Sequence, residues 1–143
     1  PVRRKPTSAE KRPLAGLRLL VAEDNSLNRE IAEELLRMNG AEVVGVENGE
    51  EAVEAFLASD PGAFDAILMD VQMPVMNGHE AARRIRLSQH PAAGKIPIIA
   101  TTANAFGDDI SAALAAGMNA HVSKPLDIDQ LCRVLLECVQ KNR

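Results

Sequence analysis

The sequence is poor in aromatic side chains, with three Phe and no Trp or Tyr. Proteins that bind single-stranded nucleic acid stack bases on aromatic rings, and membrane proteins place Trp and Tyr where lipid meets water. No apolar run approaches the roughly 20 residues that a transmembrane helix requires. We therefore expect neither direct nucleic-acid binding nor membrane contact by this domain.

Cysteine is also scarce, because Cys132 and Cys138 are the only two. They lie within a segment that has a helical pattern, at a spacing that points them in different directions and does not suit metal ligands. We expect both to be reduced thiols that pack inside a cytoplasmic domain. That domain could itself be the cytoplasmic part of a membrane-bound protein.

The basic residues gather at the beginning of the chain. The first 13 residues hold five Lys or Arg and one Glu, in a chain of 143 residues with a net charge of −4. The rest therefore carries about −8, which suits a domain that binds a divalent cation. The basic start lacks hydrophobic periodicity, as is typical of a solvated linker. We expect residues 1–15 to be a linker from an upstream domain and residues 16–143 to form one domain.

Short aliphatic and β-branched runs alternate with longer helical patterns from Leu17 onward. This alternation predicts five βα units, with a parallel sheet and crossover helices on both of its faces. The expected fold class is thus three-layer α/β/α. The predicted strands are Leu17–Ala22, Glu42–Val46, Asp65–Met69, Ile96–Thr101 and Ala120–Ser123.

Two of the helices have apolar residues at helical spacing, and the first is expected to end at Gly40 in a left-handed cap. Each apolar stripe is predicted to pack on the sheet. The stripes are Leu27, Ile31, Leu35 and Met38 in the first helix, and Ile128, Leu131, Leu135 and Cys138 in the last.

Polar side chains follow the predicted strands at their carboxyl ends. In an open parallel sheet these ends meet at one edge, where functional groups gather. Each residue alone has an ordinary explanation as a helix cap, a turn residue or a solvated charge, and it is their joint placement that predicts a site. The residues are Glu23 and Asp24 after the first strand, Asp70 after the third, Thr101 and Thr102 at the fourth, and Lys124 after the fifth.

Three carboxylates at one edge raise each other's pKa, and a divalent cation removes that cost. Mg²⁺ prefers hard oxygen ligands and takes a few carboxylates together with water and phosphate oxygens. We expect Glu23, Asp24 and Asp70 to bind Mg²⁺, with the backbone carbonyl of Gln72 as a further ligand. Asp70 is then the candidate nucleophile for phosphoryl transfer, with Lys124 offsetting the charge and Thr102 donating to a phosphoryl oxygen.

Four short motifs stand at the ends of the predicted strands: Val21-Ala22-Glu23-Asp24-Asn25, Met69-Asp70-Val71-Gln72-Met73-Pro74 with Asn77-Gly78, Thr102-Ala103, and Ser123-Lys124-Pro125. These motifs resemble those of response-regulator receiver domains, and the resemblance covers Leu17 to about Gln140. It implies a flavodoxin-like five-stranded sheet of order 2-1-3-4-5, and a phosphoryl group passed to Asp70 by a histidine kinase or histidine phosphotransfer domain. It also implies that Lys124 contacts the phosphate, that Thr102 is a switch residue, and that the bond before Pro125 is cis.

The segment Asp24-Asn25-Ser26-Leu27-Asn28, followed by an aliphatic helix, is most similar to the C-terminal receivers of hybrid sensor histidine kinases. We therefore expect a hybrid-kinase parent, with a stand-alone or transcription-linked response regulator as the alternative. A role as a switch and a role as a relay both stay open, and the pattern does not indicate an oligomeric state. His121 stands where many receivers have a Tyr or Phe that rotates as a switch. It is a candidate switch residue, an ordinary strand residue or a pH sensor.

Two other protein classes share part of this pattern. Haloacid-dehalogenase-type phosphatases need a second acidic residue two positions after the nucleophilic Asp, and Gln72 stands there. Flavodoxin-type modules cradle a phosphate in a Ser/Thr/Gly-rich loop after the first strand, where Glu23 and Asp24 would repel it. The residues favour a receiver over both classes.

Overall fold

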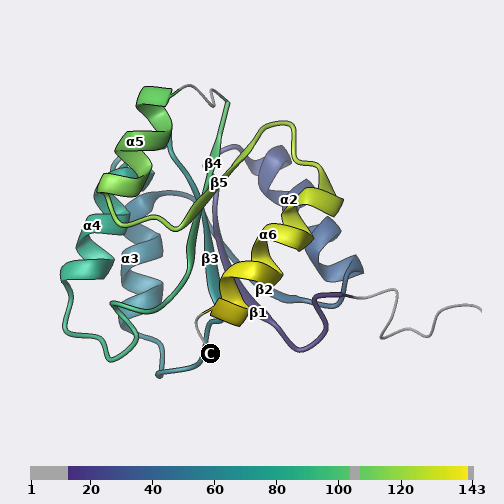
Figure 1. The fold of residues 1–143 in the computed structure, drawn as a ribbon, viewed down its shortest axis with the longest axis horizontal. Coiled ribbons are helices and arrows are strands. Elements are labelled where there is room, and N and C mark those ends of the chain that lie inside the picture. The colour runs from purple at the N-terminus through teal and green to yellow at the C-terminus, as the bar shows by residue number, and fades with distance from the viewer. Residues whose placement is uncertain (1–12, 104–106, 142–143) are drawn as a thin grey trace, which may run out of the picture.

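The computed structural model describes residues 13–103 and 107–141. Five parallel strands form one sheet of order β2-β1-β3-β4-β5 (Figure 1), which confirms the predicted fold class and strand order. The strands are β1 (Arg18–Ala22), β2 (Glu42–Val46), β3 (Ala66–Asp70), β4 (Ile98–Thr102) and β5 (Ala120–Ser123).

Five helices connect and follow the strands, and they cover both faces of the sheet. Figure 1 shows α2 and α6 on one face and α3, α4 and α5 on the other. Each face has its own hydrophobic cluster, with Leu19 and Leu68 in the first and Leu20 and Ile67 in the second. The helices are α2 (Ser26–Met38), α3 (Gly49–Leu57), α4 (Gly78–Leu87), α5 (Gly107–Ala115) and α6 (Ile128–Lys141).

Asparagine side chains cap the N-terminal ends of three of these helices. Asn25, Asn48 and Asn77 accept hydrogen bonds from the backbone amides of Asn28, Glu51 and Glu80, at 2.9, 2.8 and 2.9 Å. Such a cap satisfies an amide that would otherwise have no partner in the first turn. The caps at Asn25 and Asn77 fix where the loops after β1 and β3, which carry the site, turn into helix.

The predicted inward face of α2 is wrong. Leu27 is 62% exposed and Met38 67% exposed, whereas Ala32 and Leu36 are the buried residues of this helix. Ala32 and Leu36 are also four positions apart, so the spacing of apolar residues predicted a helix correctly. The large aliphatic residues at that spacing, however, are not the ones that the helix buries. In α6 the stripe is shifted in part, because Val139 is buried and Cys138 is half-buried.

Strands β2 and β5 have the predicted bounds, and the bounds of β1, β3 and β4 differ from the prediction by one or two residues. Asp70 and Thr102 are the last residues of β3 and β4, so the sheet itself fixes their backbone. Strand β4 begins at Ile98, since Pro97 has no amide to donate to a ladder. Gly40 has a φ of 100°, in agreement with the predicted cap of the first helix.

Leu14 belongs to the packed domain, although it falls in the predicted linker. It is fully buried, and its amide donates to the Asn39 carbonyl at 2.8 Å. The domain therefore begins before residue 16, and residues 1–12 of the predicted linker lie outside the described residues. In the part of the chain that the structure describes, no helix is long and apolar enough to cross a membrane.

Candidate functional site

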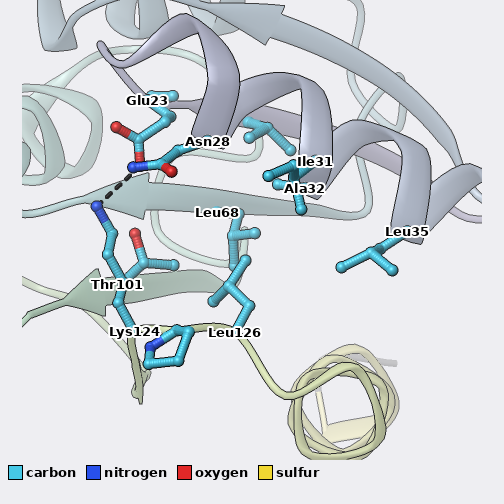
Figure 2. Close-up of a pocket in the computed structure, with 12 residues that line it drawn as sticks. Glu23, Asn28, Ile31, Ala32, Leu35, Leu68, Thr101, Lys124 and Leu126 are labelled. Carbon is cyan, nitrogen blue, oxygen red and sulfur yellow. Dashed lines mark hydrogen bonds and ion pairs between the residues drawn. The ribbon is translucent and has the colours of Figure 1, made fainter.

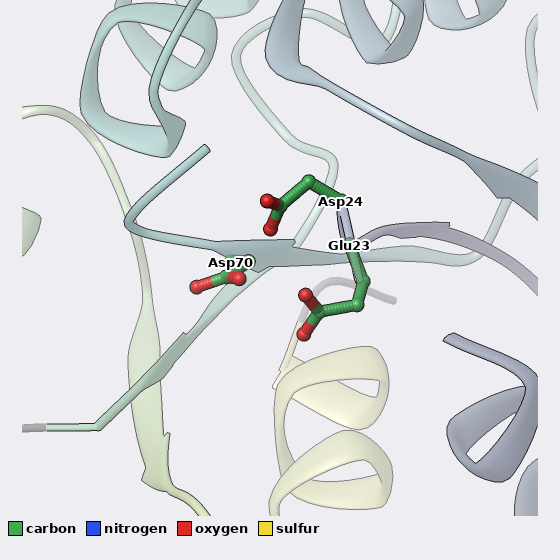
Figure 3. A group of neighbouring side chains, drawn as sticks. All are labelled: Glu23, Asp24 and Asp70. Carbon is green, nitrogen blue, oxygen red and sulfur yellow. The ribbon is translucent and has the colours of Figure 1, made fainter. Parts of the chain in front are cut away.

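Three carboxylates converge at the carboxyl ends of β1 and β3 (Figure 3). Asp70 ends β3, and Glu23 and Asp24 follow β1 directly. Ligand oxygens of the three residues all lie within 4.8 Å of one another. Glu23 and Asp70 are buried while Asp24 is exposed, so the group is open to a ligand from one side. This is the convergence that the strand ends predict, and the three residues could hold a metal ion.

Lys124, which comes directly after β5, contacts two of these carboxylates. Its ammonium nitrogen lies 2.8 Å from Glu23 Oε1 and 2.9 Å from Asp70 Oδ2. Burial alone would lower the pKa of Lys124, but the hydrogen bonds to Glu23 and Asp70 and the negative charges of these two carboxylates together outweigh it and raise that pKa above its ordinary value. Lys124 is therefore a cation at neutral pH, held against the candidate acceptor. The peptide bond from Lys124 to Pro125 is cis, as the resemblance implies.

Asp70 is also held by the loop that comes after it. Its Oδ1 accepts a hydrogen bond from the Gln72 amide at 3.2 Å, which places the Gln72 backbone beside the carboxylate. The loop returns at Gly78, whose amide donates to the Val71 carbonyl at 2.9 Å. A side chain at position 78 would collide with the backbone carbonyl of Asp70. The glycine of the Asn77-Gly78 motif thus has a steric cause.

Thr102 and His121 lie on neighbouring strands near Lys124. Thr102 is buried at the end of β4, and its carbonyl accepts from the Lys124 amide at 2.8 Å. In the register of β4 with β5, Thr102 pairs with Ser123 and Ala100 with His121. His121 is half-buried. Both candidate switch residues are therefore in the strands that border the site.

Glu23 has partners that the sequence did not reveal. Its Oε2 accepts from the Asn25 amide at 3.1 Å, and its backbone carbonyl accepts from the Arg29 guanidinium at 2.8 Å. The Asn25 contact is local, because the two residues are only two positions apart in the chain. The Arg29 contact comes from the second turn of α2, and a sequence shows only that an arginine stands there.

A cavity of about 170 Å³ adjoins the carboxylates on the side of α2. Figure 2 shows Lys124 reaching Glu23 at one end of it, with Ile31 and Leu35 of α2 on one side and Leu126 on the other. Most of its lining is aliphatic, and the exposed side chains of Leu27 and Ile31 continue this apolar surface outward. The candidate site therefore has one apolar border.

Residues 19–136 match the response regulator receiver domain family. The chain belongs to this family. It is 40% identical over 121 residues to the sensor protein GacS of Pseudomonas syringae pv. syringae, a match that covers 84% of this chain and 13% of GacS. The receiver domain spans 12% to 14% of the length of the Oryza sativa and Pseudomonas relatives that it matches.

Solved receiver domains share this fold. One is the receiver domain of sensor histidine kinase PA1611 from Pseudomonas aeruginosa, which holds a magnesium ion in its active site cleft. It is 38% identical, with a TM-score of 0.78 over 88% of this chain and 99% of that chain. Another comes from the complex of the Saccharomyces cerevisiae phosphotransfer protein Ypd1 with the receiver domain of Ssk1. That match is 32% identical, with a TM-score of 0.74 over 87% of this chain and 90% of that chain.

Proposed function

We propose that this receiver domain accepts a phosphoryl group on Asp70 from a phosphohistidine. The contact of Lys124 with both Glu23 and Asp70 carries the proposal, because a fixed cation beside a buried carboxylate is what attack on a phosphoryl group requires. A carboxylate oxygen of Asp70 forms the new bond to phosphorus. The phosphorus–nitrogen bond of the donor breaks, and its electron pair stays on the imidazole.

Glu23, Asp24 and Asp70 are the residues that would hold Mg²⁺, together with the Gln72 backbone carbonyl. Their oxygens are hard donors that lie within 4.8 Å of one another, which fits this ion better than zinc. Magnesium bound there would offset negative charge on the incoming phosphoryl group and on Asp70. The relative with magnesium in its active site cleft supports this assignment.

The other assigned roles concern residues that border Asp70. Lys124 offers its ammonium to a phosphoryl oxygen, and the hydroxyl of Thr102 donates to another. Those two contacts favour one arrangement of β4 and β5, which makes Thr102 the switch residue. His121 lies next to β4 in the register and passes the change toward the surface of β5.

The phosphodonor is a histidine kinase or a histidine phosphotransfer domain that docks on α2, beside the acceptor site at Asp70. Leu27 is 62% exposed and Ile31 48% exposed there, and the apolar cavity behind Ile31 shares Lys124 and Glu23 with the acceptor site. A partner that buries this surface brings its histidine to Asp70. The solved complex of a phosphotransfer protein with a related receiver supports such a partner. The parent is a cytoplasmic or membrane-attached hybrid kinase in which the domain serves as a switch or a relay.

Phosphoramidate, a small donor with a phosphorus–nitrogen bond, tests the chemistry. We expect intact-mass measurement to show a Mg²⁺-dependent, hydroxylamine-labile phosphoryl adduct on the wild type and none on Asp70→Asn. Asp24→Asn should need more Mg²⁺ for the same labelling, whereas Asp60→Asn, an exposed aspartate far from the cluster in the sequence, should match the wild type. Labelling of Asp70→Asn at the wild-type level would overturn the proposal.

A further inference from the structure

Arg29 reaches from α2 across to the acidic loop. One of its terminal nitrogens donates to the backbone carbonyl of Glu23 at 2.8 Å, and the other lies 3.7 Å from Glu47 Oε1. Only 17% of the Arg29 side chain is exposed, against 66% for Glu47. The hydrogen bond to the carbonyl is therefore the better shielded of the two contacts, and the exposed ion pair adds little.

Strand β2 leaves room for this arginine. A side chain at Gly45 would collide with the carboxylate of Glu33 and would come 3.2 Å from Arg29 Cδ. The stem of Arg29 thus lies over a position of the sheet that has no side chain. Glycine weakens a strand interior and often marks a place where another group approaches closely. Here that group includes the arginine.

The carbonyl that Arg29 binds belongs to the peptide group between Glu23 and Asp24. Fixing this peptide group fixes the direction in which the side chains on either side of it leave the backbone. Glu23 is held at its carboxylate by Lys124 and Asn25, but Asp24 is exposed and has no comparable burial to orient it. The bond from Arg29 is then the contact from outside the loop that orients the Asp24 backbone.

We propose that Arg29 is a positioning residue for the metal-binding carboxylates Glu23 and Asp24. The inference rests on the proposed metal site and deepens it, because it assigns a residue that acts on the ligands without touching the ion. Groups that hydrogen-bond to metal ligands commonly change metal affinity by about 10-fold to 100-fold when removed. Arg29 acts in this way through a backbone carbonyl.

A purely electrostatic role and a positioning role of Arg29 predict opposite changes in Mg²⁺ affinity when this residue is replaced. Removing a positive charge near the carboxylates should strengthen the binding of Mg²⁺ if electrostatics alone mattered. Removing the hydrogen bond should weaken the binding, since the peptide group between Glu23 and Asp24 is no longer held and Asp24 loses its fixed direction. The direction of the change therefore separates the two explanations.

The experiment is calorimetric titration of Mg²⁺ into the metal-free protein. We expect Arg29→Met to bind Mg²⁺ about tenfold more weakly, and Arg29→Lys, which keeps a donor on a long stem, to recover most of the loss. Arg37→Met is the matched control, because Arg37 also reaches from α2 to a backbone carbonyl, that of Val43, in an exposed hydrogen bond of 3.3 Å. This control should bind Mg²⁺ like the wild type. If Arg29→Met does not fold, Arg29→Gln takes its place, being too short to reach Glu23.

Affinity of Arg29→Met equal to or tighter than that of the wild type would overturn the inference, as would an equal loss in Arg37→Met. A second readout separates this failure from failure of the proposed function. At saturating Mg²⁺ the Arg29→Met protein should still be phosphorylated on Asp70. A wild type that neither binds Mg²⁺ nor becomes phosphorylated would remove the proposed function, and the inference with it.

Discussion

The ammonium of Lys124 lies 2.9 Å from the carboxylate of Asp70, although 54 positions separate the two residues in the chain. The sheet makes this contact, because Asp70 ends β3, Lys124 comes directly after β5, and β4 lies between them. Both side chains point to the edge where Glu23 completes the arrangement. A buried carboxylate pair that shares one cation is the central feature of the site.

Replacing Lys124 by Met should slow phosphorylation of Asp70 without abolishing it. The variant keeps the nucleophile and the metal ligands but loses the donor that meets the phosphoryl oxygens, and one such donor is worth about 100-fold in rate. The initial rate of labelling by acetyl phosphate measures this. Lys95→Met is the control, as Lys95 is an exposed residue that precedes β4 at the opposite edge of the sheet. A rate for Lys124→Met equal to that of the control would contradict the role of Lys124.

Gly78→Ala should destabilise the domain by about 1–3 kcal/mol, because a rigid backbone carbonyl stands where the new methyl group must go. The carbonyl belongs to Asp70, so labelling should also slow. Urea unfolding followed by circular dichroism measures the stability. At Gly94 an added methyl group meets no atom within 4 Å, so Gly94→Ala should stay within about 0.5 kcal/mol of the wild type. Equal effects at the two positions would argue against a tight approach at Gly78.

Ile31→Glu should reduce phosphoryl transfer from a phosphorylated histidine phosphotransfer domain while leaving labelling by phosphoramidate unchanged. The new carboxylate on α2 would lose its water when a protein partner docks, which weakens the complex. Phosphoramidate is too small to cover this surface, so its reaction does not carry that cost. Leu114→Glu is the matched control, since Leu114 is an aliphatic residue with 57% exposure on α5. We expect about a tenfold loss at Ile31. Equal loss in both variants, or loss with both donors, would exclude α2 as the docking surface.

The stability of the domain should fall as the pH rises through the ordinary pKa of a thiol. Burial, together with the charge of Asp129, raises the pKa of Cys132. The unfolded chain then loses this proton at a lower pH than the folded chain does, so alkali favours unfolding. Urea unfolding between neutral and alkaline pH should show a smaller fall for Cys132→Ala than for the wild type. An identical pH dependence in the two proteins would show that this thiol does not contribute.

The sheet and the acidic edge could be predicted from the sequence because both depend on strand ends. Aliphatic runs identify the strands, and a parallel sheet brings the residues after each strand to the same edge. Asp70, Glu23 and Lys124 therefore come together without any knowledge of side-chain contacts. The strand order was predicted from the resemblance, since periodicity alone does not give the order of strands.

The packing of α2 could not be predicted in the same way. Leu27, Ile31 and Met38 have the spacing of a buried stripe, yet the helix packs through Ala32 and Leu36, which let it approach the sheet closely. The sequence pattern carries the helical period but does not show which apolar residues meet the sheet. The contact of Arg29 with the Glu23 carbonyl depends on this rotation of the helix, so it too appears only in the structure.

The position of the phosphoryl group tests the central claim most directly. We would phosphorylate the domain with acetyl phosphate and Mg²⁺, reduce the acyl phosphate with borohydride, and locate the reduced residue by peptide mass spectrometry. The predicted result is conversion of Asp70 to homoserine, only when Mg²⁺ is present. Conversion at another carboxylate, or a phosphoryl adduct with Asp70 left unreduced, would contradict the assignment of Asp70 as the acceptor.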